Sequence, residues 1–187
     1  MKTLQVEKKK GHHPQCLAVL EAYFQDLPVM GVEIGTNAGD LTRTILRDRP
    51  VSILFTIDPW ESRPGDGYEA GQPQEYHNEQ EAAARAKLEP YKGKVEIIKM
   101  TSDEAFEILR GLKHIDRVGF DFVWIDGHHS EEQVRRDIAN YWQLVRPGGI
   151  LGGHDYNLVP DVTKVVDEFM VGREWQTGGD FTWWTQK

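Results

Sequence analysis

Five short apolar runs, rich in β-branched residues, recur along the chain and alternate with segments of helical character. Apolar residues follow one another within these runs instead of occupying every second position, which is typical of strands covered on both faces of a parallel sheet. The runs are Val29 to Ile34, Val51 to Ile57, Val95 to Ile98, Phe120 to Ile125, and Ile150-Leu151 after a Pro-Gly-Gly turn. This alternation predicts an α/β fold of the Rossmann-like, doubly wound type with right-handed crossovers.

Helical patterns fill the intervals between the predicted strands. They run from Pro14 past Phe24, from Gly39 to Arg47, from Glu79 to Leu88, from Ser102 onward, from Ser130 to about Arg146, and from Asp161 to Met170. The helix after Ser130 has the clearest signature, because Ser130 and Gln133 form a capping-box pair. Trp175 to Thr177 and Phe181 to Thr185 predict a closing hairpin. We therefore expect a mostly parallel, seven-stranded sheet with an antiparallel C-terminal hairpin.

The length of 187 residues suits a single domain, residues 1–187, with one full core and an N-terminal helical segment over residues 1–27. Residues 61–78 break the alternation, because they contain several Gly, Pro and Tyr residues and are too irregular for a plain connection. The segment leaves the carboxyl end of the second strand and is therefore placed to cover a cleft as a lid. A disordered insertion explains it equally well.

A formal net charge of −8 argues against a surface for nucleic acid or anionic membrane, since phosphate groups require clustered Lys and Arg. No stretch approaches the roughly 18 apolar residues of a membrane span. Cys16 is the single cysteine, so no internal disulfide can form. We expect a cytoplasmic protein with a small-molecule partner, no nucleic acid and no membrane. The aromatic hairpin around Trp183-Trp184 either pairs with a second copy, giving a homo-oligomer, or simply closes the sheet.

A turn containing two glycines follows the first predicted strand, in the order Glu33-Ile34-Gly35-Thr36-Asn37-Ala38-Gly39-Asp40. It departs from the dinucleotide fingerprint G-x-G-x-x-G, because Asn37 and Asp40 replace two glycines, and pyrophosphate binding is disfavoured. The glycines still let the backbone approach a ligand at a helix N-terminus, and Glu33 suits a cationic ammonium group. Asp58 ends the second strand about 20 residues on, where an acid can accept both hydroxyls of a ribose.

These motifs together resemble those of the class I S-adenosylmethionine-dependent methyltransferases over nearly the whole chain. The resemblance rests on the loop Glu33 to Gly39, the acid Asp58, Thr101-Ser102-Asp103 after the third strand, Asp121 to Asp126, and Arg146-Pro147-Gly148-Gly149. It implies S-adenosylmethionine as the cofactor. The resemblance implies that Gly35, Thr36, Asn37 and Gly39 surround the methionine part. It implies Asp58 and Trp60 at the ribose and adenine, and Thr101 and Ser102 at the adenine edge. Glu33 and Asp126 are the remaining implied cofactor-binding residues. A positively charged sulfonium is well served by carboxylates and aromatic faces.

A second group of polar residues closes the last two parallel strands. Asp126-Gly127-His128-His129 ends the fourth strand and His154-Asp155 ends the fifth. Carboxyl ends of adjacent parallel strands lie on one rim of a sheet, so these side chains are expected to gather there.

This rim is similar to that of metal-dependent O-methyltransferases acting on catechols and macrolide sugars. The resemblance implies Asp126, His154 and Asp155 as ligands of a divalent cation and His129 as the general base, although the first member of the pair is His here where that group has an acid or amide. Oxygen ligands favour Mg²⁺ or Mn²⁺, whereas an imidazole leaves Fe²⁺, Ni²⁺ and Zn²⁺ open. In the plainer interpretation Asp126 and Asp155 only cap turns.

The predicted function is metal-assisted O-methylation of a small polar acceptor with a hydroxyl group, a sugar or a phenol. One alternative is a noncatalytic nucleotide-sensing or partner-binding module on the same fold. The other is a metal-dependent phosphoesterase, which is disfavoured because the early Asp-x-His pair of such enzymes does not occur in this sequence. His128 is expected to be structural, and surface or loop roles are expected for His12, His13, His77 and His114.

Overall fold

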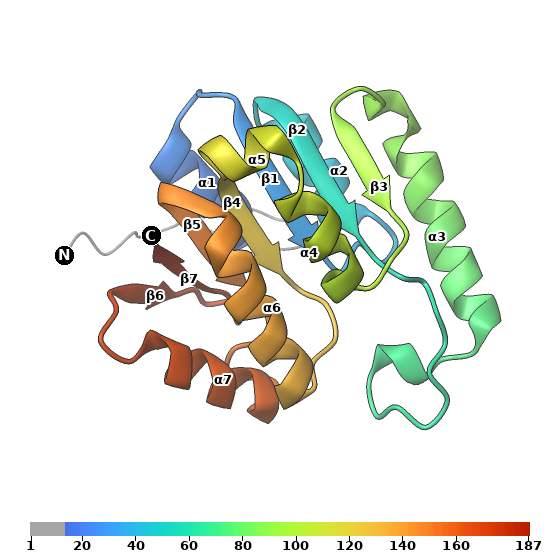
Figure 1. Cartoon of the computed structure of the whole chain (residues 1–187). Coiled ribbons are helices and arrows are strands. Elements are labelled where there is room, and N and C mark those ends of the chain that lie inside the picture. Colours follow the sequence, from blue (N-terminus) through green and yellow to red (C-terminus); the bar gives the residue numbers. More distant parts are fainter. Residues whose placement is uncertain (1–13) are drawn as a thin grey trace.

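The computed structural model describes residues 14–187, and a seven-stranded sheet forms its centre (Figure 1). The strands are β1 (Val29–Ile34), β2 (Val51–Ile57), β3 (Val95–Ile98), β4 (Phe120–Ile125), β5 (Val145–Gly153), β6 (Trp175–Thr177) and β7 (Trp183–Gln186). They lie in the order β3-β2-β1-β4-β5-β7-β6. Strands β1 to β5 pair in parallel, and β7 runs antiparallel between β5 and β6. The predicted sheet with its antiparallel hairpin is confirmed.

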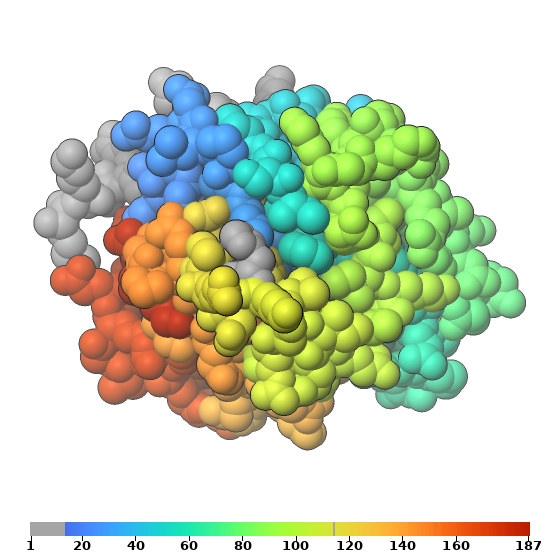
Figure 2. Space-filling view, turned by 45° about the horizontal axis from the view of Figure 1, so that its top comes forward, coloured from blue at the N-terminus to red at the C-terminus, as the bar shows by residue number. Residues whose placement is uncertain are grey.

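Helices cover both faces of this sheet. They are α1 (Pro14–Phe24), α2 (Asp40–Asp48), α3 (Gln74–Leu88), α4 (Ser102–Arg110), α5 (Lys113–Val118), α6 (Glu131–Leu144) and α7 (Pro160–Met170), with short 3-10 turns η1 (Glu69–Gly71) and η2 (Glu89–Tyr91). In Figure 1, α4 to α7 lie in front of the sheet and α1 and α2 lie behind it. The green helix α3 forms the side of the molecule opposite the red C-terminal strands (Figure 2).

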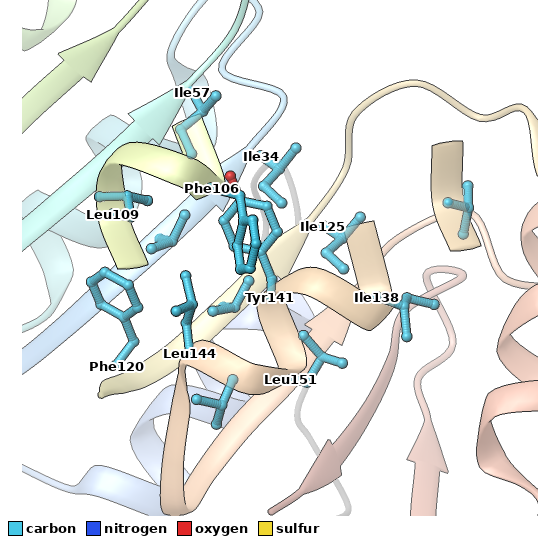
Figure 3. Packing of buried hydrophobic residues seen from close by; sticks show 14 of the residues in the cluster. Ile34, Ile57, Phe106, Leu109, Phe120, Ile125, Ile138, Tyr141, Leu144 and Leu151 are labelled. Atoms are coloured by element: carbon cyan, nitrogen blue, oxygen red, sulfur yellow. The ribbon is translucent and has the colours of Figure 1, made fainter. Parts of the chain in front are cut away.

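Two buried hydrophobic clusters, one on each side of the sheet, explain why the parallel strands are mostly apolar. One joins the strands to α4, α6 and α7, and in it Phe106 packs against Tyr141 with ring centroids 5.8 Å apart (Figure 3). The other joins them to α1 and α2 through residues such as Leu20, Ile45 and Trp124. Each such side chain contributes roughly 1.5–3 kcal/mol when it is fully buried.

The sheet reverses its direction of growth between β1 and β4, and this is where the loops open a crevice. The chain first moves outward from β1 to β3 and then returns to place β4 on the other side of β1. At such a switch point the loops leave in opposite directions, so a ligand can lie over the carboxyl ends of the strands. Gly35 has φ +93°, and a Cβ at this position would overlap the carbonyl oxygen of Asp126. A glycine is therefore required where the loops after β1 and β4 touch.

Several element boundaries differ from the sequence predictions. Helix α3 starts at Gln74, so the last part of residues 61–78 is helical, and the part before it contains the short turn η1. Helix α6 ends at Leu144, and the Pro-Gly-Gly motif lies inside β5 at a break in its pairing with β4. Helix α5 was not predicted. His12, His13 and the first part of the expected 1–27 segment lie outside the described residues.

Among residues 14–187, no helix combines the length and the apolar character needed to cross a membrane.

Candidate active site

A pocket of about 400 Å³ opens over the carboxyl ends of β1, β2 and β4. Its size falls within the roughly 300–1,000 Å³ of small-molecule sites. The predicted cofactor residues that line it are Glu33, Gly35, Thr36, Asn37, Asp58, Trp60, Thr101, Ser102 and Asp126, together with His129. The alternation of strands thus brings into one cavity residues that span nearly a hundred positions of sequence.

The loop after β1 and the end of β2 are joined by hydrogen bonds around Asp58. Its two carboxylate oxygens accept from the backbone N–H groups of Asn37 and Trp60, both at 2.8 Å. The Trp60 indole N–H in turn donates to the Asn37 carbonyl at 3.0 Å. Burial raises the pKa of Asp58, while these backbone hydrogen bonds oppose the rise. The carboxylate is held rigidly, and a lone pair on each oxygen remains to accept a ribose hydroxyl.

Three of the six non-glycine residues with positive φ in the described part of the chain lie at this rim. Asn37, Trp60 and Asp155 are not glycines, yet they have φ values of 46°, 45° and 64°. The side-chain oxygen Oδ1 of Asn37 is buried without a hydrogen-bond partner among the described residues. An unpaired buried acceptor beside a cavity fits a ligand that brings its own donor, such as the ammonium group of a methionine moiety.

Glu33 lies at the floor of the pocket and is only 1% exposed. Thr42 donates to its carboxylate, as does Thr56 at 3.0 Å. Burial raises the pKa of Glu33 to about 8, although these hydrogen bonds oppose the rise. A buried acid of this kind can hold a proton at neutral pH and can release it when a cationic group arrives.

Gly39 is the one predicted cofactor residue that does not line the pocket. It precedes α2 with φ +77°, and a Cβ there would lie 3.1 Å from the Cα of Ala84. Its glycine character therefore serves the close packing of α2 against α3.

Ser102 and Thr101 belong to the N-terminus of α4. Thr101 caps the helix through a capping box with Glu104. The Ser102 hydroxyl donates to Asp137 at 2.6 Å and accepts from Gln133 at 3.0 Å. These bonds fix the position of Ser102 at the wall of the pocket.

Asp126, His154 and Asp155 offer three ligand atoms within 4.8 Å of one another. Nδ1 of His154 lies 4.0 Å from Asp126 Oδ1 and 3.1 Å from Asp155 Oδ1. Burial alone would raise the pKa of Asp155, but the adjacent histidines His129 and His154 lower it below its usual range. Two carboxylates and one imidazole, gathered at the ends of β4 and β5, suit a divalent cation by both charge and donor type.

His129 stands between this group and the pocket. Its Nε2 lies 2.9 Å from Asp155 Oδ2 and 4.0 Å from Asp126 Oδ1. Burial alone would lower the pKa of His129, but the two carboxylates outweigh it and raise the pKa to about 9. The imidazole can therefore hold a proton within reach of the pocket. His154 and Asp155 do not line the 400 Å³ pocket, and Asp126 connects them to it.

The segment before α3 lies against the mouth of the pocket. Asp66 Oδ2 is 2.6 Å from Nε2 of His128, and the ring of Tyr68 lies edge-on to that of His129 at 5.7 Å. Glu69 accepts from the Asn37 side chain at 3.1 Å. His128, expected to be structural, thus fastens this segment, and Tyr68 forms a wall beside His129.

Sequence reasoning missed several residues of the lining, among them His77 and Gln133. His77 was expected at the surface, yet it is only 7% exposed. It shares a buried helical face with Ala84 and Leu88, at spacings of seven and eleven residues. That periodicity could have indicated its burial if the helix had been predicted to start at Gln74.

Comparisons with known proteins agree with this geometry. A family model described as a methyltransferase domain matches residues 32–156. A curated relative, uncharacterized protein R132 of Acanthamoeba polyphaga mimivirus, is 28% identical over 170 residues, which cover 86% of this chain and 70% of that protein.

Solved structures show the same fold at low sequence identity. The O-methyltransferase NovP has a TM-score of 0.62 and 20% identity, covering 93% of this chain and 80% of that one. The O-methyltransferase TomG from Streptomyces achromogenes, in complex with SAM, gives 0.62 and 19% over the same shares. The methyltransferase MycE, in complex with Mg, SAH and mycinamycin VI, gives 0.60 and 15%, covering 93% of this chain and 48% of that one. Since the family model spans more than half of the chain, this protein belongs to the methyltransferase-domain family, and the predicted class I S-adenosylmethionine-dependent methyltransferase is confirmed.

Proposed function

We propose that the protein methylates a hydroxyl group of a small polar acceptor, a sugar or a phenol, with the help of a divalent cation. The observation that carries the proposal is the position of His129, which lies 2.9 Å from Asp155 and lines the pocket beside Asp126. An imidazole that can carry a proton, carboxylates that suit a cation and a cofactor-sized cavity therefore occur side by side.

The cofactor site is assigned to the pocket floor. Asp58 would hold the ribose, Glu33 and Asn37 would face the cationic amino-acid end, and Trp60 would close the wall near the adenine. When bound, S-adenosylmethionine supplies an electrophilic methyl group on a sulfonium and leaves as S-adenosylhomocysteine. The rigid attachment of Asp58 to the backbone of Asn37 and Trp60 keeps this end of the site in place and limits misalignment of the donor.

Asp126, His154 and Asp155 would hold the cation, with Mg²⁺ or Mn²⁺ as the expected ions. A bound divalent cation supplies positive charge that lowers the pKa of a nearby hydroxyl and fixes its direction. Charge from such an ion would also offset the carboxylates that hold the proton on His129. The imidazole of His129 would then accept the hydroxyl proton while the hydroxyl oxygen forms its bond to the methyl carbon and the carbon–sulfur bond of the donor breaks.

Tyr68 and the segment that carries it would shape the acceptor side of the pocket. Tyr68 lies edge-on to both His128 and His129, at 5.6 and 5.7 Å. An aromatic wall beside the base suits a flat or ring-shaped acceptor. The O-methyltransferases among the similar structures support a hydroxyl acceptor, and MycE, with Mg and mycinamycin VI, supports the cation.

The test is release of S-adenosylhomocysteine with a panel of sugars and phenols, with and without a chelator. Replacing Asp126 by Asn should reduce turnover about 100-fold or more, as loss of a metal ligand does, while S-adenosylhomocysteine still binds. Full activity in Asp126→Asn together with insensitivity to the chelator would refute the role of the cation. The absence of turnover with every acceptor despite cofactor binding would favour the noncatalytic module.

A further inference from the structure

We propose that His77 is a cofactor-binding residue whose Nε2 forms a hydrogen bond to the ribose of the nucleoside cofactor, beside Asp58. The inference rests on the proposed cofactor site, because the ribose must lie at the end of β2. It adds a contact from α3 to those from the glycine loop and from the residues after β2.

His77 is a polar side chain in an unusual environment. It is 7% exposed and lies in the first turns of α3, on the buried face that also carries Ala84 and Leu88. It lines the 400 Å³ pocket, and the ring of Tyr76 lies edge-on to it at 5.4 Å. A solvated surface histidine would show none of these features.

The ring nitrogen Nε2 of His77 is buried and has no hydrogen-bond partner within residues 14–187. Buried polar groups are nearly always paired, and each exception needs an explanation. A leucine or phenylalanine would fill this position in α3 more favourably if packing were the only requirement. A ligand in the pocket that offers a donor or an acceptor would satisfy the nitrogen.

His77 and Asp58 line the same 400 Å³ pocket, one from α3 and the other after the end of β2. Burial raises the pKa of Asp58, and the electrostatic interaction with His77 opposes this rise. Asp58 can only accept hydrogen bonds when ionised, whereas neutral imidazole can donate or accept through Nε2 according to its tautomer. A vicinal pair of ribose hydroxyls, each both a donor and an acceptor, matches this combination.

The decisive experiment compares His77→Phe, His77→Gln and wild-type protein by calorimetric titration with S-adenosylhomocysteine. We expect His77→Phe to bind about tenfold more weakly, the effect of one lost hydrogen bond, and His77→Gln to recover part of the affinity. The melting temperature of ligand-free His77→Phe should be unchanged or higher, because the variant removes an unpaired buried nitrogen. Glu79→Gln, on the exposed side of the same helix, is the matched control and should behave as wild type.

A second titration uses the analogue of S-adenosylhomocysteine that lacks both ribose hydroxyls. Wild type should bind the complete ligand more tightly than the analogue. In His77→Phe the ratio of the two affinities should be about tenfold smaller. Unchanged affinity in His77→Phe, or a loss that is equal for both ligands and accompanied by a lower melting temperature, would overturn the proposal. If wild type itself fails to bind S-adenosylhomocysteine, the proposed cofactor site is wrong independently of His77.

Discussion

Replacing Glu33 by Gln should remove a large dependence of stability on pH. Glu33 is 1% exposed, and burial raises its pKa from 4.5 to about 8. Between these values the folded protein holds a proton at this carboxyl that the unfolded chain does not hold. A group of this kind stabilises the fold fully below its unfolded pKa, and the contribution is lost as the pH rises through the folded pKa.

The size of the effect follows from the two pKa values. One pKa unit corresponds to about 1.4 kcal/mol, so the shift of Glu33 amounts to roughly 5 kcal/mol across the window. The free energy of unfolding should fall by about 1.4 kcal/mol per pH unit between pH 5 and pH 8. Gln has nearly the same shape, stays neutral and keeps an oxygen that can accept from Thr42 and Thr56, so its contribution should not change with pH.

Urea denaturation of both proteins without ligand, at several pH values from 5 to 8, measures this difference. Asp137, whose pKa is raised by burial to about 7, adds a slope of the same sign, but it is present in both proteins and cancels in the comparison. We expect Glu33→Gln to gain several kcal/mol relative to wild type as the pH rises. Parallel pH profiles for the two proteins would show that Glu33 is ionised in the fold and would refute the reasoning.

Three further substitutions test other parts of the structure. Gly35→Ala should lower the free energy of unfolding by more than about 2 kcal/mol, because the added Cβ would overlap the carbonyl oxygen of Asp126. Chemical denaturation measures this change. An unaltered denaturation midpoint would count against the loop geometry. Asp66→Asn removes a charge from the 2.6 Å contact between Asp66 and His128. It should speed proteolysis of the segment before α3, while the free energy of unfolding of the whole protein changes by less than about 1 kcal/mol. Equal cleavage rates in the variant and wild type would mean that this contact does not hold the segment in place. Asp155→Asn should weaken Mn²⁺ binding by about tenfold or more in a calorimetric titration, and undiminished affinity would place the ion elsewhere.

The fold could be predicted from the sequence because its strongest signal is local. Strands β1 and β4 are buried on both faces, so the chain supplies nearly continuous apolar runs there. The elements that were missed or misplaced depend on tertiary contacts. Helix α5 has only six residues, and the Pro-Gly-Gly motif of β5 looks like a turn, although β4 and the C-terminal residues pair around it.

The candidate site was predictable where residues follow the ends of strands. Asp58, Asp126 and His154 each end a parallel strand, so the topology alone brings them to one rim. The close packing of Gly39 against Ala84 was not predictable, since it joins two helices far apart in sequence. His77 was missed for a related reason, because only the folded position of α3 turns it toward the pocket.

A crystal structure with S-adenosylhomocysteine and Mn²⁺ tests the central claim most directly, because the anomalous signal of manganese locates the ion without ambiguity. The account predicts one ion bound by Asp126, His154 and Asp155 at roughly 2.0–2.3 Å, with the ribose against Asp58 and the sulfur directed toward His129. An ion bound away from these three residues, or a nucleoside bound outside the pocket at Gly35, would contradict it.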